Sequence, residues 1–245
     1  MSDIYTPPLP PSPIVVWPPD DTEESVVGTD LHQMTIMNLR WGINEIARAV
    51  TPQGGPAPWQ ALSQTVVTGF HRPDNSRYKT MPDVFVYRHP IGSRRGSVAT
   101  SDEGPPALII EVLSDSTADV DLDMKKGKGY SYARVGVQEY LTIDPAGDVL
   151  PELARAWRLD GAAYRRWEPD FDGRWRSEAI AVAFGLEGLM AAVYTRDGER
   201  QLREGEVAEE RARARAELAR RDEELARRDE ELAELRRLVE QLRQG

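Results

Sequence analysis

The stretch LIIEVLSDST, residues 108–117, places one carboxylate inside an apolar strand. Five of its first six residues have large aliphatic side chains: Leu108, Ile109, Ile110, Val112 and Leu113. A short run of branched aliphatic residues predicts a buried strand of a sheet. The exception is Glu111, whose burial costs several kcal/mol unless a cation or hydrogen-bond donors compensate its charge. We therefore treat Glu111 as a candidate functional residue.

The composition limits the class of protein. The chain has 245 residues, a formal net charge of −10 and no cysteine. That length holds one sizeable domain with appendages, and the lack of cysteine excludes disulfides and thiolate-bound metals. No apolar run is long enough for a membrane helix, and residues 1–13 (MSDIYTPPLPPSP) lack the features of a signal peptide. We expect a cytoplasmic protein with no membrane partner. The acidic balance argues against general binding to nucleic acid, but leaves room for a local basic groove.

Composition also divides the chain into three parts. Residues 1–20 are rich in proline, which predicts an extended or disordered segment. Residues 21–200 have a globular composition and form the expected domain. Residues 204–245 consist almost entirely of Glu, Arg, Ala, Leu and Asp, with the unit RRDEELA repeated at 220–226 and 227–233. This last part predicts a helical tail.

The tail has a heptad pattern whose apolar seam is incomplete. Every seventh residue from 218 is apolar and takes position a: Leu218, Leu225, Leu232 and Val239. Position d is basic in the first two heptads and apolar in the last two: Arg221, Arg228, Leu235 and Leu242. We favour a homodimeric coiled coil that pairs mainly near the C-terminus. The alternative is a single solvated helix held by Glu–Arg pairs four residues apart.

The globular part predicts an α/β fold. Residues 30–50 form an expected amphipathic helix, with a proposed apolar stripe through Leu31, Met34, Met37, Trp41 and Ile46. Four apolar runs with strand character follow: 65–70, 83–88, 107–113 and 139–145. Between the last two runs, residues 121–136 predict a crossover helix that ends at Gly136, and hairpins follow Pro145. This order predicts a central mixed sheet flanked by helices.

A second carboxylate lies on a neighbouring predicted strand. Asp83 follows Pro82 and opens the run at 83–88. Because adjacent strands lie less than about 5 Å apart, the side chains of Asp83 and Glu111 can converge. Two carboxylates at one point suit Mg²⁺ or Mn²⁺, and the cation would relieve the cost of burying both.

The predicted crossover helix supplies a cation. It contains Lys125, Lys126 and Lys128, and Lys128 shares a helical stripe with Met124, Ser131 and Val135, so we expect it to face the sheet. Gly127 and Gly129 flank Lys128, and each costs a helix up to about 1 kcal/mol relative to alanine. These glycines indicate a close approach to a strand or a ligand.

Three segments together resemble the Uma family of restriction endonucleases, within the PD-(D/E)XK nuclease superfamily. They are MPDVFVY (81–87), PALIIEVLSDST (106–117) and YARVGVQEYLTIDP (132–145). The resemblance covers about residues 25–190. It implies a restriction-endonuclease-like fold, in which helices flank a central mixed sheet, and an endonuclease that hydrolyses DNA phosphodiester bonds.

The resemblance also implies roles for individual residues. Asp83 corresponds to the first acid of the motif and Glu111 to the second. Leu113 stands where the superfamily usually has its lysine, so Lys128, four residues before Tyr132, is the expected catalytic lysine, with Lys125 or Lys126 as alternatives. The expected cofactor is Mg²⁺ (or Mn²⁺), held by Asp83, Glu111 and the main-chain carbonyl of Val112. Lys128 would orient the attacking water or offset charge on the phosphate.

Other polar residues have simpler interpretations. Asp121 and Asp123 are possible further ligands, although acidic residues are common near helix N-termini, which we prefer. Glu45 is a possible ligand or a solvated helix residue. The histidines lack metal-ligand spacing and are interpreted as loop or surface residues: His32, His71 and His89. We expect the basic loop at 88–97 either to contact a phosphate backbone or to be solvated.

Three alternatives to the nuclease remain. A catalytically silent relative would keep the fold as a binding or assembly module that oligomerises through its C-terminal helix. Paired carboxylates also serve glycoside hydrolysis, which needs neither lysine nor metal. In the third, Glu111 is only a structural ion-pair partner. We rank the DNA endonuclease first.

Overall fold

The computed structural model describes residues 30–92 and 96–244. The Pro-rich segment expected at 1–20 and part of the basic loop at 88–97 lie outside the described residues. The described chain divides between Gln201 and Leu202 into two compact units. Each unit is considered by itself below.

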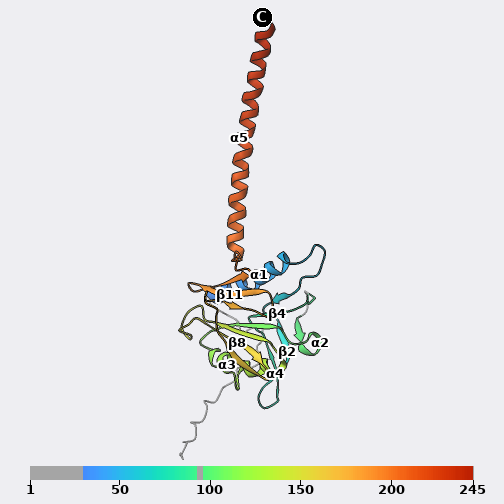
Figure 1. Ribbon diagram of the computed structural model, residues 1–245, viewed down its shortest axis with the longest axis vertical. Coiled ribbons are helices and arrows are strands. Elements are labelled where there is room, and N and C mark those ends of the chain that lie inside the picture. The colour runs from blue at the N-terminus through green and yellow to red at the C-terminus, as the bar shows by residue number, and fades with distance from the viewer. Residues whose placement is uncertain (1–29, 93–95, 245) are drawn as a thin grey trace, which may run out of the picture. The chain divides into compact units, whose positions relative to one another are not determined.

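The first unit is built on the six-stranded mixed sheet that the sequence predicts (Figure 1). Its strands, in spatial order, are β1 (Gln60–Leu62), β4 (Val84–Tyr87), β6 (Leu108–Val112), β7 (Glu139–Ile143), β8 (Ala154–Asp160) and β9 (Ala163–Trp167). Only β6 and β7 pair in parallel, and the other neighbours are antiparallel. The three strands expected around the two carboxylates therefore lie side by side.

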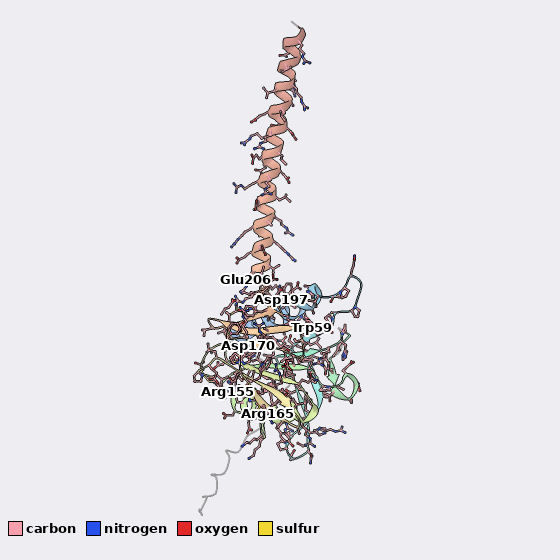
Figure 2. The ribbon with its side chains drawn as sticks, viewed as in Figure 1. Trp59, Arg155, Arg165, Asp170, Asp197 and Glu206 are labelled. Atoms are coloured by element: carbon pink, nitrogen blue, oxygen red, sulfur yellow. The ribbon has the colours of Figure 1, made fainter. Side chains whose placement is uncertain are left out.

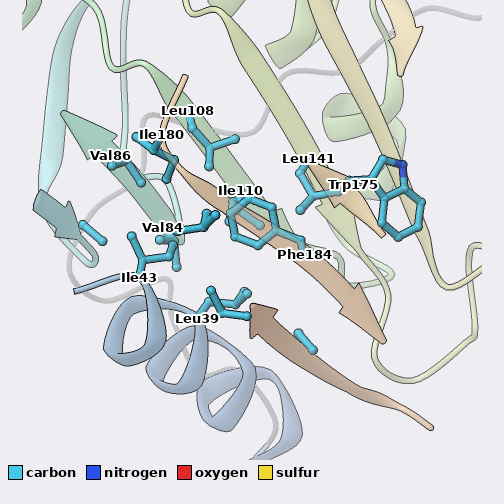
Figure 3. Packing of buried hydrophobic residues seen from close by; sticks show 14 of the residues in the cluster. Leu39, Ile43, Val84, Val86, Leu108, Ile110, Leu141, Trp175, Ile180 and Phe184 are labelled. Carbon is cyan, nitrogen blue, oxygen red and sulfur yellow. The ribbon is translucent and has the colours of Figure 1, made fainter. Parts of the chain in front are cut away.

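One face of the sheet packs against a helix and a small sheet. The helix is α1 (Asp30–Ala49), and the small sheet consists of β10 (Trp175–Arg176), β11 (Val182–Glu187) and β12 (Met190–Thr195). Figure 3 shows Leu39 and Ile43 of α1 beside Val84, Ile110 and Phe184 in this core. The helix forms where predicted, and Ile46 of the proposed stripe is buried, but the stripe is wrong at Met34 and Met37, which are 50% and 56% exposed. The other buried apolar residues of the helix are Ile36, Leu39, Ile43 and Ala47.

The other face carries the helices that build the candidate site. They are α3 (Ala118–Leu122) and α4 (Lys128–Val135), and the short α2 (Thr100–Glu103) lies elsewhere in the unit. A three-stranded sheet, ordered β3 (Arg77–Thr80), β2 (Val66–His71) and β5 (Ser97–Ala99), packs on the same face through an aromatic core. The strand predicted at 65–70 thus forms, but it lies outside the central sheet.

The crossover segment differs from its prediction as one helix over 121–136. Its C-terminus is as expected, because Gly136 adopts φ 92° and ends α4 in the left-handed conformation. Residues 121–122 end the separate helix α3, and residues 123–127 form a turn instead of a helix. The carboxylate of Asp123 accepts hydrogen bonds from the amides of Lys125 and Lys126, at 2.7 and 2.9 Å, and this local bonding breaks the helix before Lys128.

The second unit contains one long helix, α5 (Glu204–Gln244), as the tail sequence predicts. Pairs of Glu and Arg four residues apart line it, including Glu217 with Arg221 at 2.6 Å and Glu224 with Arg228 at 2.7 Å. Such pairs stabilise an exposed helix by a few tenths of a kcal/mol each. Pairing of this helix with a second chain stays a prediction. Within the described residues, no helix is both long and apolar enough to cross a membrane.

The loop after β7 depends on one buried carboxylate. Asp144 is 1% exposed and accepts hydrogen bonds from the amides of Gly147, Val149 and Leu150, at 2.9, 2.7 and 2.7 Å. We expect Asp144→Ala to lower the free energy of unfolding by about 2–4 kcal/mol, because three backbone amides lose a charged acceptor that is itself buried. The exposed Asp148 in the same loop supplies the control. Urea unfolding that ranks the two alanine variants equally would contradict this role for Asp144.

Candidate active site

Asp83 and Glu111 lie at the ends of two neighbouring strands, and hydrogen bonds from backbone amides connect the two residues. The antiparallel register pairs Val84 of β4 with Ile110 of β6, so Asp83 and Glu111 come next on the two strands. The amide of Val112 donates to Asp83 Oδ2 at 2.7 Å, and the amide of Asp83 donates to Glu111 Oε2 at 3.3 Å. Each carboxylate therefore accepts a hydrogen bond from the other's strand, as the adjacency of the strands predicts.

Glu111 receives two further donors from α4. Its side chain is 2% exposed, and its Oε1 lies 2.6 Å from the Tyr132 hydroxyl and 3.2 Å from Lys128 Nζ. Lys128 and Tyr132 are four residues apart on one helix, so both side chains point to the same side. The buried carboxylate is compensated by one cation and two neutral donors.

A third carboxylate reaches the same lysine. Asp121 of α3 is 1% exposed, and its Oδ1 lies 3.0 Å from Lys128 Nζ. Asp121 lies in the first turn of a helix, where acidic residues are common, but its carboxylate is buried against Lys128. Asp123 points elsewhere and bonds to the amides of Lys125 and Lys126. Lys128 therefore bridges Glu111 and Asp121.

Gly127, which precedes Lys128, packs closely against the backbone of the preceding segment. This close packing lets the lysine reach the sheet. A Cβ atom added to Gly127 would lie 2.1 Å from the carbonyl oxygen of Val120 and 2.8 Å from that of Asp123. The neighbour is thus the backbone of the preceding segment, not a strand or ligand. Lys125 and Lys126 are exposed, whereas Lys128 is 5% exposed. Of these three lysines, the structure brings Lys128 to Glu111.

Two more side chains reach the site without a signal in the sequence. His32 lies in the first turn of α1, and its Nε2 is 3.4 Å from Asp83 Oδ1. Its interpretation as a loop or surface residue is wrong, because its side chain is 13% exposed and helical. The distance along the chain from His32 to Asp83 leaves no local pattern to detect. Tyr132 served only as a landmark for Lys128, yet it is a direct partner of Glu111.

The remaining candidates lie away from this cluster. Glu45 forms an ion pair with Arg48 on the same helix. His89 pairs with Glu103 at 3.1 Å, and the main-chain carbonyl of His71 accepts a hydrogen bond from Ser131. Since Glu45 is bound to its own helix neighbour, it is not positioned beside Asp83 as a ligand.

The cluster carries excess negative charge in a buried place. Burial raises the pKa of Glu111 to about 8, with Lys128 opposing the rise and the charges of Asp121 and Asp83 adding to it. Burial also raises the pKa of Asp121 above its ordinary value. The positive charge of one lysine therefore does not balance the three carboxylates around it.

This raised pKa predicts a pH-dependent stability. Unfolded Glu111 titrates near 4.5 and folded Glu111 near 8, so folding takes up a proton between these values. The stabilisation is complete below pH 4.5 and is lost as pH rises through 8, by up to about 1.4 kcal/mol per unit. We expect urea midpoints to fall over this range in the wild type and to fall less in Glu111→Gln. Equal slopes in the two proteins would contradict the assignment.

The donors fit a hard divalent cation. Carboxylate and main-chain oxygens are the ligands that Mg²⁺ prefers, and a cation would neutralise the undercompensated charge of Asp83 and Glu111. Within the described part of the chain, no group of three or more His, Asp and Glu side chains has a metal-holding arrangement. A metal here would therefore use Asp83, Glu111 and a main-chain oxygen, with solvent completing its shell.

A comparison with protein families finds a match over the central part of the chain. The model of the family Uma2, described as a putative restriction endonuclease, matches residues 44–187. The match includes Asp83, Glu111 and Lys128, and it excludes His32. Among curated proteins, none matches the sequence.

Proposed function

The chain belongs to the Uma2 family of putative restriction endonucleases, and from this premise we propose that it is a metal-dependent endonuclease that hydrolyses DNA phosphodiester bonds. The main support for the proposal is the environment of Glu111, a buried carboxylate that accepts hydrogen bonds from the amide of Asp83 and from Lys128. An acid pair beside a buried lysine is costly to fold, and it supplies the groups that phosphodiester hydrolysis needs. The lack of cysteine favours a cytoplasmic location.

The residues that would hold the cofactor are Asp83, Glu111 and the main-chain carbonyl of Val112. A bound Mg²⁺ or Mn²⁺ supplies Lewis acidity toward the scissile phosphate and lowers the pKa of a coordinated water. The amide of Val112 already bonds to Asp83 and so fixes the orientation of that carboxylate. His32 approaches the other oxygen of Asp83 and restricts it further.

The protein's own cation supports the reaction from the α4 side. Lys128 Nζ lies within 3.2 Å of both Glu111 and Asp121, so it is held in place before substrate binds. In this position Lys128 orients the attacking water and offsets negative charge that develops on the phosphate. Tyr132 keeps Glu111 Oε1 directed toward the lysine. Asp121 acts through Lys128 as a positioning residue.

Incubation with nucleic acid tests the proposal directly. Supercoiled plasmid, linear duplex, single-stranded DNA and RNA are each mixed with the full chain in Mg²⁺, in Mn²⁺ and in EDTA. We expect cutting of DNA with either metal and none with EDTA. A folded protein that cuts none of these substrates would contradict the proposal, and it would favour the alternative of a binding or assembly module.

We further propose that two chains pair through α5. Its apolar heptad positions are 50 to 61% exposed: Leu218, Leu225, Leu232, Leu235 and Val239. Burying such side chains against a second copy would stabilise the helix, which its internal ion pairs do only weakly.

Sedimentation of two matched variants checks this pairing. We expect Leu232→Ser with Leu235→Ser to convert a dimer to a monomer at micromolar concentration, because both residues lie where the a and d positions are apolar. Leu218→Ser should have a smaller effect, since its heptad has Arg221 at position d. A wild-type chain that sediments as a monomer would contradict the pairing.

A further inference from the structure

A hollow lies on the same face of the central sheet as the candidate active site. It has a volume of about 590 Å³. The segment Leu122–Lys125 forms one wall, and side chains of β8 and β9 form the other. The hollow begins one residue after Asp121, whose carboxylate contacts Lys128. One wall of the hollow therefore follows directly in sequence from a residue of the candidate site.

The sheet register places the hollow beside Glu111. Glu111 of β6 pairs with Thr142 of β7, and Thr142 pairs with Arg155 of β8, so these three side chains lie on one face at one level. Two strand spacings separate Glu111 from Arg155, a distance of about 10 Å. Along a B-DNA strand, with a rise of about 3.4 Å per nucleotide, this corresponds to roughly three nucleotides.

The next level of the sheet forms the floor of the hollow. Tyr140 of β7 pairs with Trp157 of β8, and Trp157 pairs with Arg166 of β9. The rings of Tyr140 and Trp157 stack with centroids 5.4 Å apart, and the Arg166 guanidinium lies 5.8 Å from the Trp157 centroid. The tryptophan is 7% exposed, so the surface open to a ligand is mainly that of the arginines.

The charges of the hollow favour an anion. Three cations line it, Lys125, Arg155 and Arg166, against the carboxylates of Asp123 and Glu152. Glu152 lies 2.7 Å from Arg155 and 3.5 Å from Arg166, so one carboxylate holds both guanidinium groups together. Hydrogen bonds from Arg155 lower the pKa of Glu152. Outside the lining, Glu168 lies 3.2 Å from Arg166, so the excess of one positive charge holds only among the lining side chains.

We propose that this hollow binds the phosphate backbone of the DNA strand next to the scissile phosphate, through Lys125, Arg155 and Arg166. The inference rests on the proposed nuclease function and adds the surface that positions its substrate. Guanidinium groups match phosphate geometry, and such contacts fix the register of a nucleic acid without reading its bases. Binding at the hollow would set which phosphate reaches Lys128.

Neighbouring residues of β9 supply a matched control. Arg165 precedes Arg166 and therefore points to the opposite face of the sheet, where it pairs with Asp160 at 2.6 Å. Figure 2 labels Arg155 and Arg165, which come from adjacent strands. The exposed Lys79 of β3 completes a control that removes the same two charges outside the hollow.

The test compares Lys125→Ala/Arg166→Ala with Lys79→Ala/Arg165→Ala. Binding of a fluorescent DNA duplex is measured by anisotropy in EDTA over a range of salt concentrations. We expect the hollow variant to bind about tenfold more weakly at 0.1 M salt and to lose about 2 units from the slope of log K against log salt. The control variant should bind within about twofold of the wild type and should cut DNA at the wild-type rate.

The outcomes separate the two proposals. A wild type that binds and cuts DNA, with equal losses in the two double variants, would overturn the hollow alone. A wild type that neither binds nor cuts would overturn the nuclease and the hollow together. Should the hollow variant unfold at a lower temperature, Lys125→Glu alone provides the same test, because that side chain is exposed. Charge reversal there should weaken binding by more than Lys79→Glu does.

Discussion

Glu111→Gln should abolish metal-dependent DNA cleavage and leave the fold intact. Loss of a charged ligand removes several kcal/mol of transition-state stabilisation, so we expect the rate to fall at least about 10³-fold. The amide has nearly the same shape, and its oxygen still accepts from Tyr132, while its NH2 group replaces the oxygen that accepts from the Asp83 amide. Asp83→Asn should have an effect of the same order. Single-turnover cleavage of plasmid measures both.

Two further readouts distinguish a metal ligand from a structural residue. Mn²⁺ should raise the melting temperature of the wild type and not that of Glu111→Gln, because a ligand stabilises only the protein that binds it. At pH 8 the Gln variant should melt no lower than the wild type, since it removes a charge that is costly to bury. Glu45→Gln is the control, and it should cut DNA normally. Equal losses at Glu45 and Glu111 would contradict the assignment.

Lys128→Ala should lower the cleavage rate by about 10²- to 10³-fold, the usual loss when one preorganised electrostatic donor is removed. It should also destabilise the protein, because Glu111 and Asp121 lose the cation that they share. Without Lys128 nearby, the pKa of Glu111 rises further. Lys128→Met keeps most of the volume and separates the charge from the packing.

The neighbouring lysines give a sharp comparison. Lys126→Ala should cut DNA at the wild-type rate, because Lys126 is exposed and away from Glu111. Lys125→Ala should weaken DNA binding at the hollow. If Lys128→Met cuts normally while Lys126→Ala does not, the lysine has been assigned to the wrong position.

The sequence predicts the central features of the site because they depend on neighbouring strands. Strong apolar runs predict β4, β6 and β7, and their adjacency brings Asp83 to Glu111. Helical spacing and the family resemblance both favour Lys128, and the structure places its Nζ 3.2 Å from Glu111, while its catalytic role stays a prediction. These inferences needed only strand order and one short spacing along the chain.

The rest of the site depends on contacts between distant segments. His32 reaches Asp83 because α1 packs against the central sheet, on the face opposite to α4. The two residues are far apart in the sequence, so no spacing of residues predicts their contact. The break of the crossover segment depends on hydrogen bonds from one side chain, Asp123, which outweigh the helical propensity around it. The sequence marks Asp121 as a possible ligand, but its burial against Lys128 depends on how the segment folds.

The location of the lysine outside β6 has a consequence for mutational tolerance. Leu113, at the position where a lysine is usual, is 4% exposed, and its amide bonds to the carbonyl of Ile143. The strand thus stays apolar to its end, and its stability does not depend on a charged group within it. The exposed turn at residues 115–116, which precedes α3, can then gain residues while the sheet persists. Libraries that vary the length of this segment should yield folded proteins with graded activity, a favourable starting point for directed evolution.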